Sequence, residues 1–405
     1  MCSISLKVQL KPYFYRCGFG GILALILSFW LLEAHAQQIR YRYVSLDQIA
    51  LAAGFTQLYP SAILNNGRVY VTLCDATCSN TEFAYIEDGT LTVLPQVPPG
   101  SFAGPVNASG TIGGSILVDP VNFIFRAAIF KGGQVKLIPP LPGEQFASVL
   151  ALNDNDTALV ASSDASGNTT YELYRNGTAT PINFGPNIEN PFFTLFGVCR
   201  CINNNGIIEG TEGPGLYNGA RGFRLDPRNG NAMILNPFPG DPSETLAWGQ
   251  AINQAGNVLG YSFTPGLPYH ERIGVWGPNG VFYSYFVETE GSNRLLFNDN
   301  NLIVITEFFG LNVSYVVPGP GVRLNLANLV VNLPAGQDLF LISDLNNNGD
   351  MIGSSSTQAN FLLQRLNAGD QQVYTTPLVK ITPHAIPPVI AMMRSRLRQQ
   401  SGPAK

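Results

Sequence analysis

Residues 251–262 read Ala-Ile-Asn-Gln-Ala-Gly-Asn-Val-Leu-Gly-Tyr-Ser, which is an apolar run, a tight turn and a second apolar run. Asparagine tolerates the left-handed backbone of such a turn, and glycine adopts it without steric cost. Equivalent turns, clear in the first three cases and weaker in the others, begin at Asn107, Asn203, Asn346, Leu64, Asn153 and Asn298. The sequence therefore predicts a chain of repeated β-hairpins.

The spacing of these turns sets the size of the repeat. Taking Asn253 as the first residue of the turn quoted above, successive turns lie 43, 46, 50, 50, 45 and 48 residues apart. One four-stranded blade of a β-propeller takes roughly 40–50 residues. The sequence thus predicts an all-β fold, a β-propeller with seven blades of about 43–50 residues each.

The fifth repeat shows the expected order of strands in one blade. Residues 245–252 and 257–262 form the first hairpin, and a variable loop follows. Residues 272–276 and 281–286 then flank Gly-Pro-Asn-Gly, which is a strong turn signal. Each blade is therefore expected to consist of two hairpins.

The first 36 residues have the pattern of a signal peptide. Basic residues precede an apolar run over residues 21–32, and the small-x-small site Ala-His-Ala follows at 34–36. A membrane anchor is the alternative, but a spanning helix needs about 20 apolar residues. We therefore expect cleavage after residue 36, a secreted or periplasmic location, and no transmembrane segment in the mature chain.

The rest of the chain divides into a propeller over residues 37–382 and a basic C-terminal tail over residues 383–405. The last blade takes its fourth strand either from residues 40–46 or from residues 373–380. The first choice pairs the two ends of the propeller and removes an open sheet edge, so we favour it.

Charge argues against one class of partner. The chain has 23 Lys and Arg against 27 Asp and Glu, a formal net charge of −4, and no basic stripe. Binding of nucleic acid requires a clustered positive face. We therefore expect a protein or glycan partner, no nucleic acid, and a monomer.

Four cysteines follow the signal peptide, and export to an oxidising compartment makes them disulfide candidates. Cys74 and Cys78 flank a predicted loop and can close on each other. A bridge between Cys199 and Cys201 is harder to form, because alternate residues of one strand would strain it. Zinc bound by all four is a less favoured alternative, since the pairs lie three blades apart.

Few residues suited to catalysis or metal binding are present. After the signal peptide the only histidines are His270 and His384, and Gly-x-Ser-x-Gly is absent, which disfavours a serine triad. Residues 344–349 have the alternating oxygens of a calcium loop, but position twelve is Ser355 instead of glutamate. A plain hairpin turn is favoured there and at residues 153–156, with calcium as the alternative. We expect no metal and no cofactor.

Three arginines occupy equivalent positions at the start of third strands, 18 or 19 residues after the turn asparagine: Arg126, Arg221 and Arg272. They are candidate ligand-binding residues for an anionic group. The favoured alternative is that they pair with neighbouring strands at the blade edge.

Paired carboxylates for glycoside hydrolysis would have to come from different inter-strand loops. The candidates are Glu209, Glu212, Asp241, Glu244, Glu288 and Glu290. Solvated surface carboxylates are the simpler interpretation of this set.

The repeat resembles the bacterial extracellular HAF repeats, named for a His-Ala-Phe triplet. The match is good over residues 251–262, where Ala-Ile-Asn-x-x-Gly precedes Val-x-Gly-x-Ser, and it covers about residues 60–366 in outline. Residues 220–225 and 272–276 match the triplet region only loosely, and no repeat contains His-Ala-Phe itself. The resemblance implies secretion and a propeller-like fold, and it implies no particular chemistry.

These observations favour an exported propeller that acts as a non-enzymatic binding or scaffold module for a glycan or protein partner. A polysaccharide-active enzyme with carboxylates at the mouth of the propeller channel is the alternative. Two carboxylates at glycosidase distance in a cleft would favour the enzyme. A mouth lined with Asn, Ser and aromatic residues would favour binding.

Overall fold

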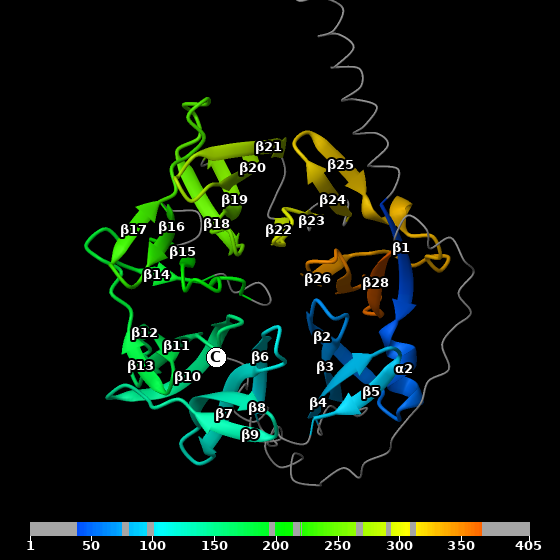
Figure 1. Cartoon of the computed structure of the whole chain (residues 1–405), viewed down its shortest axis with the longest axis horizontal. Helices are drawn as coiled ribbons and strands as arrows, with labels where there is room; N and C mark the ends of the chain where they lie inside the picture. Colours follow the sequence, from blue (N-terminus) through cyan, green and yellow to red (C-terminus); the bar gives the residue numbers. More distant parts are fainter. Residues whose placement is uncertain are drawn as a thin grey trace, which may run out of the picture.

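The computed structural model describes residues 39–74, 81–94, 101–193, 199–213, 219, 221–264, 270–288, 293–307 and 313–366. The predicted signal peptide, the tail, the alternative strand at 373–380 and Cys78 lie outside these residues. Within the described ranges the chain is mostly β-strand, with one α-helix, α2 (Leu46–Ala52), and one 3-10 helix, η1 (Leu326–Leu329). The sheets stand around a common centre (Figure 1), which is the arrangement of a β-propeller.

Four sheets are each built from four consecutive antiparallel strands. The first holds β2 (Gln57–Ile63), β3 (Val69–Cys74), β4 (Thr81–Glu87) and β5 (Thr90–Val93). The second holds β6 (Ser101–Val106), β7 (Ile112–Asp119), β8 (Ile124–Lys131) and β9 (Gln134–Leu137). The third holds β10 (Glu144–Leu152), β11 (Ala158–Asp164), β12 (Thr169–Arg175) and β13 (Thr178–Pro181). The fourth holds β22 (Asn293–Phe297), β23 (Ile303–Glu307), β24 (Ser314–Gly319) and β25 (Val322–Asn325).

An eight-stranded sheet lies between the third and fourth of these sheets. Its strands are β14 (Pro191–Phe192), β15 (Ile208–Glu212), β16 (Arg221–Asp226), β17 (Asn231–Ile234), β18 (Leu246–Ile252), β19 (Val258–Thr264), β20 (His270–Trp276) and β21 (Phe282–Glu288). One parallel pair, Arg221 with Ala247, joins β16 to β18, whereas every antiparallel ladder of this sheet has at least two residue pairs and most have four or more.

The last sheet joins the two ends of the described chain. It holds β26 (Leu341–Leu345), β27 (Met351–Ser354), β28 (Asn360–Leu366) and β1 (Arg40–Ser45), in the order β1-β28-β27-β26. The register of β1 against β28 runs from Arg40 opposite Leu366 to Ser45 opposite Phe361 (Figure 1, blue beside orange). The strand expected over residues 40–46 ends at Ser45, because α2 begins at Leu46 with the Ser45 hydroxyl accepting from Gln48 N.

The core consists of apolar layers between neighbouring sheets. Leu58 and Val71 of the first sheet, for example, pack with Ile352 and Leu362 of the last sheet in one buried cluster. Alternate residues of each strand face opposite neighbours, so a single strand contributes to two layers. The sheets are therefore held together by burial of apolar side chains on both faces.

Glycine is required seven residues after three of the turn asparagines. A Cβ atom at Gly114, Gly260 or Gly353 would lie 2.1, 1.9 or 2.1 Å from a carbonyl oxygen of the opposite strand. The pairing register shifts in each of these hairpins. The repeated glycine therefore permits a close approach of the two strands at an irregular point of the hairpin.

Candidate functional site

The turn asparagines fold their own hairpins. In the third sheet the Oδ1 atom of Asn153 accepts from Asn155 N at 3.0 Å and from Thr157 N at 2.9 Å. The same pair of bonds, to residues two and four positions later, is made by Asn203 and Asn298. The side chain thereby satisfies backbone donors that the sharp turn leaves unpaired.

The same side chains also link one turn to the next around the centre of the molecule. The Nδ2 atom of Asn107 donates to Asn153 O at 3.0 Å, and that of Asn153 donates to Asn203 O at 2.8 Å. Asn203 continues to Asn253 O at 3.2 Å, Asn298 to Asn346 O at 2.9 Å, and Asn346 to Leu64 O at 2.9 Å. Asn253 donates instead to Asn301 Oδ1 at 3.2 Å. The turns thus form a nearly continuous circle of amide hydrogen bonds.

The residues that follow these turn positions form a second circle, which we name the polar rim: Asn65, Ala108, Asp154, Asn204, Gln254, Asp299 and Asn347. Each rim backbone N–H from Ala108 onwards donates to the side-chain oxygen of the next rim residue, at 2.7 to 3.0 Å. All seven are exposed or half-exposed. The circle was not predicted from the sequence, although six of the seven positions carry a polar side chain.

A cavity of about 130 Å³ lies inside the rim, and an ion pair crosses it. Arg200, in the segment between β14 and β15, places Nη2 2.7 Å from Asp344 Oδ1 on β26 and 2.5 Å from Leu345 O. Asp344 Oδ2 accepts from Ile63 N at 2.9 Å. Asp344 is buried. Its bonds to Arg200 and to Ile63 therefore connect the last sheet with the segment before β15 and with the first sheet, inside the rim.

All three carboxylates that line this cavity are engaged within the protein. Asp154 accepts from Ala108 N and from Asn204 Nδ2, and Asp299 accepts from Gln254 N and from Asn347 Nδ2. Asp344 is held by Arg200 and by the backbone, as described above. These carboxylates act as hydrogen-bond acceptors that shape the mouth of the cavity.

The structure places Arg126, Arg221 and Arg272 in separate strands and does not bring them together. Arg126 donates to Glu144 O at 3.1 Å and Gln145 O at 3.3 Å. Arg221 pairs with Glu212 at 2.5 Å. Arg272 pairs with Glu244 at 2.8 Å and lies over the ring of Phe238. None of the three lines the central cavity, and their role in binding a ligand stays a prediction.

Of the carboxylates considered for hydrolysis, Asp241 and Glu244 meet at one arginine, Arg272. Glu212 and Glu244 each face an arginine, and Asp241 lies 3.6 Å from Arg272. Glu290 lies outside the described residues. Glu209 is fully buried on β15, and burial raises its pKa to about 8, so its neutral form is favoured, but substrate has no access to it.

A disulfide joins Cys199 and Cys201, with 5.1 Å between their Cα atoms, within the usual range for a bridge. These cysteines flank Arg200, so the bridge constrains the segment that delivers the central guanidinium. Cys74 is buried at the end of β3. Within the described ranges, no group of three or more His, Cys, Asp or Glu side chains could hold a metal ion.

No family model and no curated protein matches the chain. Among solved structures, the β-propeller domain of the Trilobed protease from Pyrococcus furiosus is 11% identical, with a TM-score of 0.49 over 79% of this chain and 100% of that domain. The acylaminoacyl peptidase from Pyrococcus horikoshii is 12% identical, with a TM-score of 0.48. That match covers 80% of this chain and 53% of the peptidase, so the chain spans about half of its length. TolB from Acinetobacter baumannii is 13% identical, with a TM-score of 0.35 over 58% of this chain and 55% of TolB.

These likenesses concern the β-propeller fold alone. The resemblance to HAF repeats stays a prediction from the sequence. None of the helices in the described part of the chain is long and apolar enough to cross a membrane.

Proposed function

We propose that the chain is an exported propeller that binds a glycan or a protein at the polar rim and does not catalyse a reaction there. The observation that carries the proposal is the rim itself. It presents amides and carboxylates in a fixed circle around a small cavity, and two circles of hydrogen bonds support it. A binding site that is already rigid in the free protein loses little conformational entropy when a ligand binds.

We also propose that the ring has seven blades, as the turn spacing predicts. A single residue pair joins the two halves of the eight-stranded sheet, and separating them there gives two blades of four strands each. The pairing of β1 with β28 supports closure through the N-terminal strand. Export through a cleaved signal peptide predicts a mature N-terminus at Gln37, which mass spectrometry of the secreted protein would measure.

Engagement of the mouth carboxylates supports binding over hydrolysis. Glycosidases need one carboxyl as acid and a second as base or nucleophile, about 5–10 Å apart. At this mouth Asp154, Asp299 and Asp344 already accept hydrogen bonds from the protein. The rim amides that engage these carboxylates keep a second amide N–H, and a ligand would use those remaining donors for sugar hydroxyls or for peptide groups.

The proposal is tested by calorimetric titration of the protein with neutral oligosaccharides, and hydrolysis products are measured in parallel. Asn204→Ala removes a rim amide, and we expect it to weaken binding about tenfold, which corresponds to 1.4 kcal/mol. Asn122→Ala is the matched control, because Asn122 is exposed and bonds only to Asp119 among the described residues. Release of products would support the enzyme instead. A panel without any binding sugar would refute the glycan ligand.

A further inference from the structure

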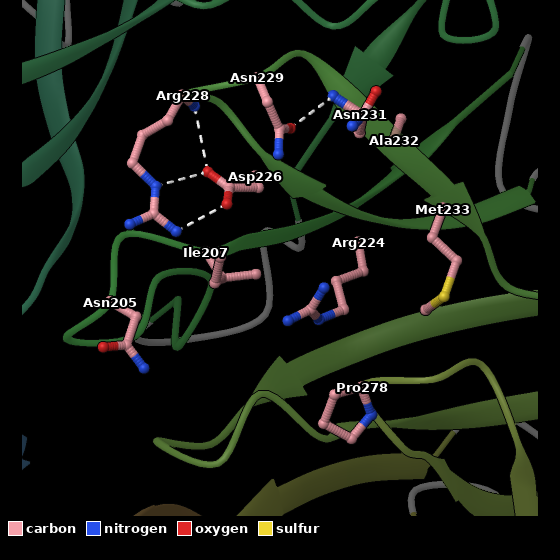
Figure 2. Close-up of a pocket in the computed structure, with 10 residues that line it drawn as sticks. All are labelled: Asn205, Ile207, Arg224, Asp226, Arg228, Asn229, Asn231, Ala232, Met233 and Pro278. Atoms are coloured by element: carbon pink, nitrogen blue, oxygen red, sulfur yellow. Dashed lines mark hydrogen bonds and ion pairs between the residues drawn. The ribbon is translucent and has the colours of Figure 1, made fainter.

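A second pocket lies outside the rim on the same face of the molecule. The turn at residues 203–206 contributes Asn204 to the rim and Asn205 to this pocket, which has a volume of about 500 Å³. Strands β16 and β17 supply Arg224 and Met233, and the turn after β20 supplies Pro278 (Figure 2). The outer pocket therefore spans the boundary between the two halves of the eight-stranded sheet.

Its net positive charge comes from two guanidiniums, those of Arg224 and Arg228, that share the single carboxylate of Asp226. Arg228 also lines the pocket, but both oxygens of Asp226 face Arg228, at 2.8 and 2.6 Å (Figure 2). Arg224 uses its Nε atom to donate to Gly256 O at 3.1 Å. Among the residues that the structure describes, its two terminal nitrogens make no hydrogen bond, and the side chain is half-buried.

Anchoring through Nε orients this group for one kind of ligand. With Nε held by a carbonyl, the two terminal nitrogens remain as a planar pair of donors, which matches the two oxygens of a carboxylate. Partial burial strengthens the attraction, because fewer water molecules compete for the donors. The pocket thus favours a carboxylate-bearing ligand.

The remaining lining indicates what carries that carboxylate. Asn205, Asn229 and Asn231 present amides, which both donate and accept, as neighbouring sugar hydroxyls require. Met233 and Pro278 form an apolar wall against which one face of a sugar ring can pack (Figure 2). A pocket that bound only an inorganic anion would need neither the amides nor the apolar wall.

We propose that the outer pocket binds a uronic acid residue of an acidic glycan, with its carboxylate on the terminal nitrogens of Arg224. This site goes beyond the proposed function and does not depend on it, because the rim requires no charge on its ligand. A glycan that occupied both sites would cross the turn at residues 203–206.

The test compares trigalacturonic acid with its methyl ester by calorimetric titration at neutral pH. We expect the acid to bind at least tenfold more tightly than the ester. Arg224→Gln should abolish that preference, whereas Arg175→Gln should keep it. Arg175 is the matched control, because it is an exposed arginine at the end of a third strand in the neighbouring sheet.

Two further substitutions separate the contribution of charge from that of the apolar wall. Arg224→Lys, which keeps the charge but loses the planar fork, should retain a smaller preference for the acid, and Met233→Ala should weaken acid and ester equally. Equal affinity of acid and ester for the unmodified protein, or a preference that survives Arg224→Gln, would overturn the assignment. A peptide with a free C-terminus is tested in the same way. If it bound more tightly than trigalacturonic acid and lost that affinity in Arg224→Gln, the ligand of the pocket would be a peptide and not a sugar. Neutral-sugar binding and its loss in Asn204→Ala report on the rim separately.

Discussion

Replacement of Asn153 by alanine tests whether the turn asparagines hold the propeller together. The side chain is buried and makes three hydrogen bonds, two within its own turn and one to Asn203 O in the next turn. Each such bond contributes about 0.5–1.5 kcal/mol net, and the loss leaves buried groups unpaired. We therefore expect Asn153→Ala to lower the free energy of unfolding by about 2–4 kcal/mol.

Equilibrium unfolding in urea, followed by tryptophan fluorescence, measures this change. Asn155→Ala is the matched control, because Asn155 lies in the same turn but is exposed and uses its side chain for one bond, to Asn204 O at 2.7 Å. It should cost about 1 kcal/mol or less. If Asn153→Ala costs no more than Asn155→Ala, the circle of amides has no structural importance.

Asn153→Asp separates the two roles of the side chain. An aspartate keeps an acceptor for Asn155 N and Thr157 N, but it places an oxygen where Nδ2 donates to Asn203 O. We expect destabilisation at neutral pH that decreases on acidification, because a protonated carboxyl can donate that bond again. Destabilisation that is independent of pH would show that the link between the turns contributes little.

Three further substitutions follow from the same structure. Gly260→Ala should cost about 1–3 kcal/mol in urea unfolding, since its Cβ would lie 1.9 Å from Trp248 O. Arg200→Gln should destabilise more than Asp344→Asn, because it removes the ion-pair partner of a buried carboxylate and leaves only the more distant charge of Arg294, at a cost of up to about 3–5 kcal/mol. After Asp344→Asn, in contrast, Arg200 remains partly solvated, and the reverse order of the two costs would refute this. Burial raises the pKa of Glu209 from 4.5 to about 8, so its ionisation penalises the folded state increasingly between these values. Compared with Glu209→Gln, the unmodified protein should lose about 1.4 kcal/mol of its free energy of unfolding per pH unit between pH 4.5 and about 8, and nothing below pH 4.5. Equal pH dependence of the two proteins would contradict this expectation.

The hairpins could be predicted because their signals are local. An asparagine that accepts from residues two and four positions later defines a turn within five residues, and the periodicity of these turns is visible in the sequence alone. Residues 257–262 were expected to form a strand and nearly coincide with β19, and the strand expected over residues 272–276 lies within β20. The short helix α2 was not expected, because only seven residues form it.

The central ion pair could not be predicted, since its partners lie 144 residues apart. In the sequence Asp344 indicated a turn or a calcium ligand, and Arg200 was only the residue between two cysteines. Their pairing depends on the closure of the ring, which brings opposite sheets within reach of one side chain. The polar rim is an intermediate case: its residue types recur in the sequence, but their meaning depends on the circular arrangement.

The asymmetry of the ring connects the two proposed sites. Both circles of hydrogen bonds are interrupted at the same junction, because Leu64 replaces a turn asparagine and Ala108 is the apolar member of the rim. Leu64 instead packs with Tyr70 and Ile112 across that junction, and burial of a leucine contributes about 1.5–3 kcal/mol, similar to the bonds it replaces. The junction therefore keeps its stability but loses its polar surface. A polar ligand should accordingly sit toward Asn204 and Gln254, the side of the rim that continues into the outer pocket.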